Sequence, residues 1–518
     1  MNILRSAGAP IEIDELSITE LSIRHAERLK DSLAFVDGPT GRSMTYGDFA
    51  ERVRRVAGGL KARGVGPGTT WAIMAPNSPE YAVVFHALAY AGGTVTTLNP
   101  SYGVREVVHQ LKDAEATTLV ASALFAETAE AAAKEAGVEL RMYEGAAEAF
   151  FADIEGEPLA EQVRVPLKDH VVALPYSSGT TGLPKGVMLT HHNLVANVLQ
   201  LEAHKHVAEG EVCFAVLPFF HIYGMQVLMN FMLARGCTVV TAPRFDMVQM
   251  LELTQKWKVS RLFLVPPVVL ALAKHPIVDK FDLSSVVEIF SGAAPLGGDL
   301  AEAAAKRLGC SVAQGYGMTE LSPVTHTIQE GHYRAGSVGT LVPNTEARVV
   351  TEGDDGARSD AAIGERGELW IRGPQVMKGY LGNADATGST VDADGWLHTG
   401  DIAIVLEDGH TFIVDRMKEL IKVKGFQVAP AELEALLVGH EEIADAAVIG
   451  VPDLEAGERV KAFVVRTSES LSEEAVKEHI AAQVATYKKI SVVEFLEAIP
   501  KSASGKILRR ELRARENS

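Results

Sequence analysis

The strongest constraint on the fold is an alternation of strand-like and helix-like patterns in the first hundred residues. Residues 71–76 form a short apolar run. Ser78 and Pro79 then supply an N-cap and a first-turn proline for an apolar helical pattern over residues 81–91, which ends at two glycines. Residues 94–98 form a second strand-like run. A strand, a helix and a strand in this order predict two parallel strands joined by a right-handed crossover.

Similar alternation recurs around Val239 and over residues 261–265. We therefore expect a large α/β N-terminal domain with doubly wound sheets. Residues 334–415 differ, because short strand-like runs alternate there with glycine-rich turns, as in a small β-barrel-like subdomain. The alanine- and glutamate-rich residues 121–149 are typical of surface helices.

After residue 416 the pattern changes again, to that of a compact α+β module. Helices are expected at residues 430–438 and 472–484, and strands at 444–450 and 460–465. The sequence thus predicts an N-terminal domain of residues 1–415 and a mobile C-terminal lid of residues 416–518.

Composition and charge narrow the class of protein. The chain of 518 residues is long enough to need no disulfide or metal for stability. Its 67 carboxylates outnumber its 49 lysines and arginines, giving a net charge of −18, which argues against a nucleic-acid binder but not against a local basic pocket. The three cysteines, Cys213, Cys237 and Cys310, fit no metal motif and are expected to be buried free thiols.

Neither terminus carries a recognisable address. The N-terminus has no basic stretch followed by an apolar core, and the C-terminus has no lipidation or peroxisomal signal. No window is apolar enough for a membrane span. A cytoplasmic enzyme is therefore expected, and its oligomeric state is left open.

Residues 176–187, Tyr-Ser-Ser-Gly-Thr-Thr-Gly-Leu-Pro-Lys-Gly-Val, are the strongest chemical motif. The loop follows an apolar run, so we expect it to leave a strand. Its glycines let the backbone approach a ligand closely, and its hydroxyls and Lys185 are donors suited to phosphate oxygens. Composition alone would also fit a surface loop. A Walker A loop requires Ser or Thr after Gly-Lys, and this order is absent here, which disfavours P-loop ATPases and kinases.

This loop resembles the phosphate loop of the adenylate-forming superfamily, which contains acyl-CoA synthetases, beetle luciferases and peptide-synthetase adenylation domains. The resemblance continues in the same order with Gln-Gly-Tyr-Gly-Met-Thr-Glu at 314–320 and Gly-Trp-Leu-His-Thr-Gly-Asp at 395–401. It extends to residues 415–427 and 500–506. The run Leu-Pro-Phe-Phe-His-Ile-Tyr at 217–223 is most similar to the 4-coumarate–CoA ligase branch.

The resemblance implies an acid–thiol ligase that uses ATP, coenzyme A and Mg²⁺. A carboxylate would attack the α-phosphorus of ATP, and the acyl group would then pass to coenzyme A with release of AMP and pyrophosphate. Two anions must meet in the first step, so the site must supply positive charge and hydrogen-bond donors.

The family's nucleotide-binding and catalytic positions carry over residue by residue. Lys506 matches the lysine that bridges the acid and the α-phosphate, although a lysine near a chain end is otherwise usually a solvated charge. Asp401 and Arg416 match the residues that hold the ribose, although an Asp after Thr-Gly is more often a turn or cap residue. Glu320 is the expected Mg²⁺ partner. The full ATP- and AMP-binding set is Ser177, Ser178, Gly179, Thr180, Thr181, Lys185, Gln314, Gly315, Tyr316, Thr319, Asp401, Arg416, Lys418 and Lys506.

Other positions match the lid and the coenzyme A route. Lys418 matches the hinge, and Lys422 and Gln427 match residues that contact the adenylate. The predicted catalytic residues are Lys506, His221, Lys422 and Gln427, and the predicted coenzyme A contacts are Arg244, Lys424 and Gly425. A surface salt bridge is the plain alternative for Arg244, and a satisfied core histidine for His221.

The predicted acyl pocket decides the substrate. Its small residues leave a flat slot suited to an aromatic or planar acid. Phe290 replaces a basic residue of the plant ligases, and Gln226 replaces an asparagine, which disfavours strict 4-coumarate preference. Cinnamate-like, other aryl and medium-chain acids stay open, whereas an α-amino acid is disfavoured because no carboxylate precedes His221. The pocket residues are Ile222, Tyr223, Gln226, Val227, Phe290, Gly292, Ala293, Gly315, Gly317, Pro323 and Val324.

Three alternatives remain. A fatty-acyl-AMP ligase would stop at the adenylate or load a carrier protein, but such enzymes tend to carry an insertion that is absent between residues 416 and 430. A luciferase-type oxygenase would emit light with a luciferin. A non-catalytic binding protein would turn over no ATP with any acid.

Overall fold

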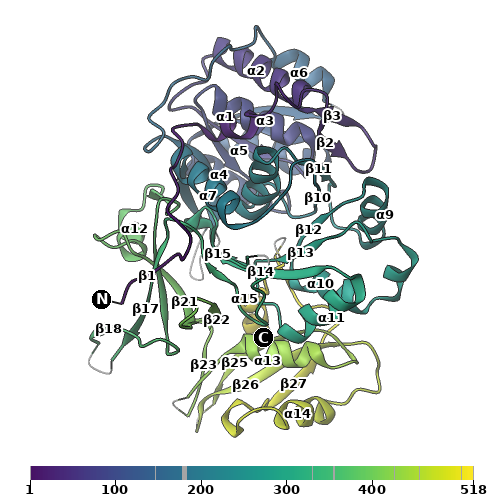
Figure 1. Ribbon diagram of the computed structural model, residues 1–518, viewed down its shortest axis with the longest axis vertical. Coiled ribbons are helices and arrows are strands. Elements are labelled where there is room, and N and C mark those ends of the chain that lie inside the picture. The colour runs from purple at the N-terminus through teal and green to yellow at the C-terminus, as the bar shows by residue number, and fades with distance from the viewer. Residues whose placement is uncertain are drawn as a thin grey trace.

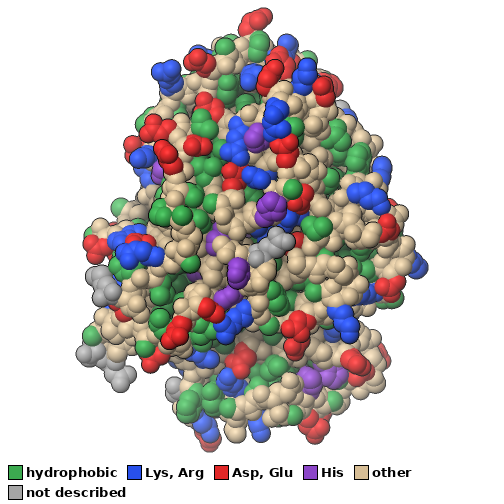
Figure 2. Space-filling view, viewed as in Figure 1, with side chains coloured by type: hydrophobic (Ala, Val, Ile, Leu, Met, Phe, Trp, Pro, Cys, Tyr) green, Lys and Arg blue, Asp and Glu red, His purple; other side chains and the backbone are tan. Residues whose placement is uncertain are grey.

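The computed structural model describes residues 2–145, 147–177, 184–329, 331–353, 356–424, 426–453, 455–502 and 505–516. Figure 1 shows the N-terminal α/β region in purple and teal above, a green β-sheet at one side, and the yellow C-terminal module below. No helix of the described residues is long and apolar enough to cross a membrane. On the face drawn in Figure 2, basic and acidic side chains are interspersed.

The strand–helix–strand unit predicted near the N-terminus is confirmed. Strand β4 (Thr70–Met74), helix α3 (Pro79–Tyr90) and strand β5 (Thr94–Thr97) follow one another, and β4 and β5 pair in parallel. The Ser78 side chain accepts a hydrogen bond from the Tyr81 amide and caps α3. The unit belongs to a seven-stranded sheet in the order β20 (Gly379–Tyr380), β9 (Lys185–Thr190), β8 (Val171–Ser177), β5, β4, β6 (Ala116–Ser122), β7 (Glu139–Tyr143).

A second, nine-stranded sheet packs with the first. From β14 to β2 its neighbouring strands are parallel, and its ends are antiparallel. Its order is β16 (Thr340–Leu341), β15 (Val324–Thr327), β14 (Ser311–Gly317), β13 (Glu288–Ser291), β12 (Arg261–Leu264), β10 (Val212–Ala215), β11 (Thr238–Thr241), β2 (Leu33–Asp37), β3 (Ser43–Thr45).

Helices cover both faces of the seven-stranded sheet, as a doubly wound architecture requires. Along β4, Ile73 packs into the large core with α3 and the second sheet, whereas Ala72 and Met74 pack into a separate core with α4 and α5. This alternation follows from the two-residue repeat of a strand. The helices are α1 (Ile18–Ile23), α2 (Tyr46–Ala62), α4 (Val104–Asp113), η1 (Ala123–Phe125), α5 (Ala126–Ala136), α6 (Glu148–Ile154), α7 (His191–His204), the π-helix η2 (Gly224–Phe231), α8 (Met232–Ala234), α9 (Met247–Trp257), α10 (Pro266–Lys274), η3 (Pro276–Lys280), α11 (Gly298–Leu308) and η4 (Thr319–Leu321).

The alanine- and glutamate-rich segment is only partly helical. Helix α5 lies there as expected and α6 begins only at the end of the segment, but strand β7 lies between them and pairs in parallel with β6. The pattern of β7 is hard to recognise because most of its side chains are at least partly exposed.

The predicted β subdomain is an open half-barrel rather than a closed barrel. Its six strands run antiparallel, and among the described residues the end strands β1 and β22 do not pair with each other. The first strand comes from the N-terminus, which the sequence pattern did not predict. The strand order is β1 (Leu4–Arg5), β17 (Glu346–Glu352), β19 (Arg366–Arg372), β21 (Leu397–Val405), β22 (Thr411–Arg416), with β18 (Arg358–Asp360) on β17. A short helix, α12 (Ala384–Thr390), accompanies it.

The C-terminal module has its own sheet and its own core. The core includes Ile421, Leu433, Val448 and Ile480. The four predicted elements are all present, as α13, α14, β25 and β26. The sheet order is β24 (Phe426–Val428), β23 (Ile421–Val423), β26 (Gly457–Arg466), β25 (Ile443–Asp453), with β27 (Val492–Phe495) on β26, and the helices are α13 (Pro430–Gly439), α14 (Glu473–Ala481), η5 (Thr486–Lys488) and α15 (Arg509–Arg515).

Candidate active site

Asp401 lies at the centre of the candidate site. Antiparallel pairing of β21 with β22 sets it opposite Arg416, whose Nε lies 3.4 Å from Asp401 Oδ1. The Tyr316 hydroxyl, from the end of β14, donates to Asp401 Oδ2 over 2.5 Å. Burial raises the pKa of Asp401, although the charge of Arg416 opposes this. The half-barrel and the nine-stranded sheet therefore meet at the Asp401 carboxylate, which Arg416 from one and Tyr316 from the other hold in position.

The C-terminal module brings Lys506 to the same place on a tight turn. The Ser502 amide donates to the Lys506 carbonyl over 2.8 Å, and the chain reverses at Gly505, where φ is +80°. A side chain on Gly505 would place its Cβ 3.0 Å from Val265 Cγ2, at the end of β12. The turn thus docks closely against the N-terminal domain, and the glycine permits both the backbone conformation and the approach.

The electrostatics of Lys506 show which groups surround it. Burial lowers its pKa, the positive charge of Arg416 lowers it further, and Glu320 and Asp401 oppose both effects. Burial, followed by the charge of Lys506, lowers the pKa of His221 to about 3, so this imidazole is neutral at pH 7. The sequence-predicted residues Lys506, His221, Asp401, Arg416 and Glu320 are therefore brought together.

Glu320 anchors the stem of the predicted phosphate loop. The Ser177 hydroxyl donates to Glu320 Oε1 over 2.9 Å, and the Tyr380 hydroxyl donates to the same oxygen over 2.8 Å. Ser177 pairs with Lys185 across the β8–β9 hairpin, and Lys185 Nζ lies 4.9 Å from the centre of the Tyr380 ring. The predicted phosphate contacts Ser178, Gly179, Thr180 and Thr181 lie outside the described residues.

These residues could hold a magnesium ion only together with oxygen ligands from a bound nucleotide and water. In the described part of the chain no group of three or more His, Cys, Asp or Glu side chains could hold a metal. Glu320 is 5% exposed and its carboxylate contacts the phosphate-loop stem, with Thr319 next to it on η4. Mg²⁺ commonly takes one or two carboxylates and completes its shell with phosphate oxygens and water, which matches this arrangement.

Gln314 fixes the loop that follows β13. Its side-chain oxygen accepts from the Leu296 amide over 3.1 Å, and its Nε2 donates to the Leu296 carbonyl over 3.3 Å. Within that loop Ala293 has a φ of +69°, which is unfavourable for a residue with a Cβ. Such strain is concentrated at functional sites, and Ala293 belongs to the predicted acyl pocket.

Aromatic rings fill much of the slot that the small residues leave in the predicted acyl pocket. A Cβ on Gly292 would lie 2.7 Å from Tyr223 Cε1, and a Cβ on Gly315 would lie 2.5 Å from Phe290 Cζ. The Tyr223 hydroxyl donates to the Phe290 carbonyl over 3.3 Å. The glycines are therefore required for the two rings to pack. Gly317 approaches the Pro323 carbonyl in the same way, and Ile222, Val227 and Val324 are buried.

The amide of Gln226 is already engaged. Its Nε2 donates to the Leu194 carbonyl over 2.6 Å, and its oxygen accepts from Asn230 Nδ2 over 3.0 Å. Gln226 lies on the π-helix η2 and is fully buried against α7. Its polar group therefore serves packing between two helices. His221 Nδ1 likewise accepts from the Tyr223 amide over 3.3 Å, which leaves Nε2 as the donor nitrogen.

The remaining predicted residues lie apart from this cluster. Lys422 and Gln427 pair across the β23–β24 hairpin, and their side chains are exposed, as is that of Lys424. Lys418 is exposed in the turn between β22 and β23, where the half-barrel ends and the C-terminal sheet begins. Arg244 is exposed between β11 and α9, and among the described residues it forms no ion pair. Gly425 lies outside the described residues.

The fold combines a large α/β domain with a small C-terminal one, and the buried cluster of charged residues lies where the two meet. Residues 23–381 match the family described as AMP-binding enzyme, and residues 432–506 match the AMP-binding enzyme C-terminal domain. The chain belongs to the AMP-binding enzyme family.

Individual relatives agree with this membership. The chain is 43% identical to 4-coumarate–CoA ligase 1 of Petroselinum crispum over 94% of its length and 92% of the relative's. The anthranilate CoA ligase AuaEII in complex with anthranoyl-AMP aligns with a TM-score of 0.89 and 25% identity over 98% of both chains. ATP-bound MatB from Rhodopseudomonas palustris aligns with a TM-score of 0.87 and 29% identity over 97% of this chain and 99% of that one.

Proposed function

We propose that this protein is an acid–CoA ligase that forms an acyl-adenylate and transfers its acyl group to coenzyme A. The observation that carries the proposal is the meeting of Lys506 with Asp401, Arg416 and Glu320 at the junction of three sheets and the C-terminal module. The 4-coumarate–CoA ligase relatives, which match most of the chain, support it.

In the first half-reaction, an oxygen of the acid attacks the α-phosphorus of ATP, and the bond to the β-phosphate breaks to release pyrophosphate. Asp401 accepts hydrogen bonds from the ribose hydroxyls, and Lys506 donates to the acid and the α-phosphate, where negative charge accumulates. Glu320 would hold Mg²⁺, and the ion would supply positive charge that screens the phosphates. Burial of Lys506 strengthens its electrostatic effect, since fewer water molecules screen it.

In the second half-reaction, the coenzyme A thiolate attacks the acyl carbon, and AMP leaves with the oxygen that came from the acid. We propose that residues 416–518 turn about Lys418 between the two steps. This motion would withdraw Lys506 and bring Lys422, Gln427, Lys424 and Gly425 toward the adenylate. The exposed side chains of Lys422, Lys424 and Gln427 support this, because they are available to contact a ligand after such a rotation. Arg244, exposed and without an ion pair among the described residues, is suited to a coenzyme A phosphate.

The acid is proposed to be aryl, cinnamate-like or of medium chain length. Tyr223, Val227, Phe290 and Val324 supply buried apolar walls, and the buried Gln226 amide is already satisfied, which supports an apolar acyl group over a strongly polar one. We place the enzyme in the cytoplasm, where ATP and coenzyme A are available.

A product assay tests this function. The protein is incubated with ATP, Mg²⁺ and a panel of cinnamates, benzoates and fatty acids, with and without coenzyme A. An acyl-CoA product together with AMP and pyrophosphate is the expected result. Accumulation of acyl-AMP without a thioester would instead identify an acyl-AMP ligase that serves a carrier protein, and no acid-dependent AMP formation would exclude both.

A further inference from the structure

A cavity of about 420 Å³ lies at the beginning of three neighbouring parallel strands of the nine-stranded sheet. Arg261, Glu288 and Ser311, the first residues of β12, β13 and β14, line it. Much of the rest of its wall is apolar, including Ala301 and Ala305 of α11. Its size is within the range of about 300–1,000 Å³ that is typical of small-molecule pockets.

The ring of Phe290 lies between this cavity and the predicted acyl pocket. Phe290 pairs with Ala313 across β13 and β14, and Ala313 lines the cavity. Gly315, two residues further on and therefore on the same face of β14, lies under the tip of the same ring. Lys205 lines the cavity and holds its Nζ 4.8 Å from the centre of the ring. One part of the ring therefore contacts the acyl slot, and another contacts the cavity wall.

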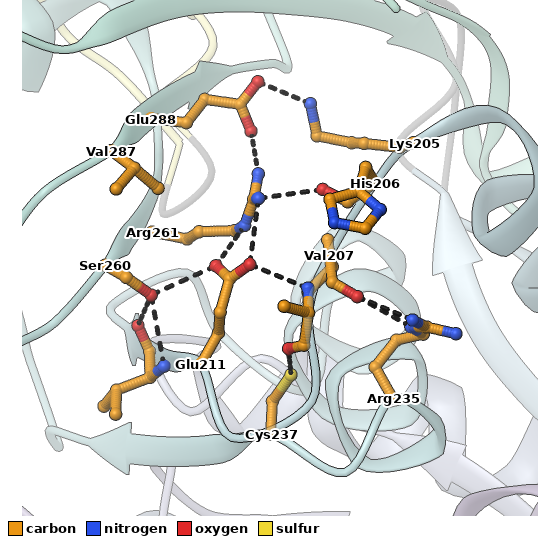
Figure 3. Close-up of polar contacts among 12 residues, drawn as sticks. Lys205, His206, Val207, Glu211, Arg235, Cys237, Ser260, Arg261, Val287 and Glu288 are labelled. Carbon is orange, nitrogen blue, oxygen red and sulfur yellow. Dashed lines mark hydrogen bonds and ion pairs between the residues drawn. The ribbon is translucent and has the colours of Figure 1, made fainter. Parts of the chain in front are cut away.

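Three charged residues of the cavity wall, Lys205, Arg261 and Glu288, are paired, and the exposed Glu302 adds a negative charge at the wall. Figure 3 shows Lys205 and Arg261 converging on Glu288, at 2.6 and 2.5 Å, and Arg261 also contacting Glu211 at 2.5 Å. Two positive and two negative side chains leave this group neutral, and all four are at most 15% exposed. A second carboxylate on a substrate would find no free cation in this group, so the cavity suits an uncharged, apolar chain.

We propose that Phe290 closes the acyl pocket against this cavity and thereby sets the maximum length of the acid, and that the cavity holds the apolar tail of a longer acid once the ring is removed. The inference rests on the proposed ligase function and specifies its substrate range. It assigns the cavity as an extension of the acyl site and Phe290 as the residue that limits length.

The test compares chain-length profiles of the wild type, Phe290→Ala, and Phe290→Ala combined with Ala305→Phe, which narrows the cavity from α11. kcat/KM for acyl-CoA formation is measured with straight-chain acids from C4 to C16 and with dicarboxylic acids of the same lengths. Phe290→Ala should raise kcat/KM for long monocarboxylic acids at least about tenfold relative to short ones, since one methylene in an apolar pocket is worth roughly tenfold or more. Ala305→Phe should remove that gain, and dicarboxylic acids should not show it.

Controls keep the result decisive. Ala305→Phe alone should keep the wild-type activity with short acids, because α11 contributes no residue to the predicted acyl pocket. Phe290→Leu, which leaves a smaller void, replaces Phe290→Ala if the latter does not fold by circular dichroism. An unchanged length profile in a folded Phe290 variant, or a gain that survives Ala305→Phe, would overturn the inference. Failure of the wild type to make any acyl-CoA would instead refute the proposed function.

Discussion

Replacing Lys506 with alanine tests the division of labour between the two half-reactions. Lys506 and Arg416 face the carboxylates Glu320 and Asp401, so these four residues together are neutral. The substitution leaves them with one net negative charge at the proposed meeting point of the acid and the α-phosphate. A unit charge at 4 Å is worth about 4 kcal/mol at an effective dielectric constant of 20. We therefore expect adenylation to slow by roughly a thousandfold, at about 1.4 kcal/mol per factor of ten.

The assay measures each half-reaction separately, as acid-dependent pyrophosphate release and as thioester formation from supplied acyl-AMP. Only the first should collapse. Lys501→Ala is the matched control, because Lys501 lies in the same segment but its Nζ pairs with Asp445 at 2.6 Å, within the C-terminal module. It removes the same charge and should change adenylation by no more than about fivefold, the cost of an ordinary surface ion pair. Equal loss of both half-reactions in Lys506→Ala would refute the assigned role.

Three further predictions concern the same two steps. Lys418→Pro should restrict the turn between the half-barrel and the lid and slow thioester formation more than adenylation, and rates of both steps left intact would show that the hinge lies elsewhere. Arg416→Gln removes a charge that lowers the pKa of Lys506, so this pKa should rise. The loss of adenylation rate that accompanies deprotonation of Lys506 should then occur at higher pH. A shift of this loss to lower pH would contradict the assignment. Lys274 Nζ donates to the carbonyls of Val438, in the last turn of α13, and of its C-cap residue His440, over 2.9 and 3.2 Å. Lys274→Ala should therefore weaken docking of the C-terminal module by roughly 1 kcal/mol and slow adenylation about fivefold, which single-turnover kinetics would measure.

Local pattern predicted the parts of the fold that depend on neighbouring residues. The helix capped by Ser78 and the strands on either side of it are where the pattern indicated, because caps and apolar runs act within a few residues. Strand β1 was not predictable in this way. It is two residues long, and its Leu4 pairs with Ala347, so its conformation is decided by a partner far along the chain. Closure of the barrel likewise depends on pairing between distant strands and not on local alternation.

The candidate site shows the same limit. Motif order pointed to Asp401 and Lys506, which the structure brings together. It did not point to Tyr380, whose hydroxyl donates to Glu320 and whose ring lies under the Lys185 ammonium. Tyr380 reaches the site because β20 pairs with β9, some 190 residues away along the chain. The sequence also did not predict that the rings of Tyr223 and Phe290 pack beside Gly292 and Gly315. Small residues in a sequence do not reveal which neighbouring side chain fills the space that they leave.

The adenylate is the central claim, and an oxygen label tests it most directly. An acid labelled with ¹⁸O in its carboxylate is turned over with ATP and coenzyme A, and the AMP is analysed by mass spectrometry. Attack of the carboxylate on the α-phosphorus predicts AMP that carries one ¹⁸O from the acid. AMP without the label, or label found in orthophosphate alongside ADP, would contradict the account.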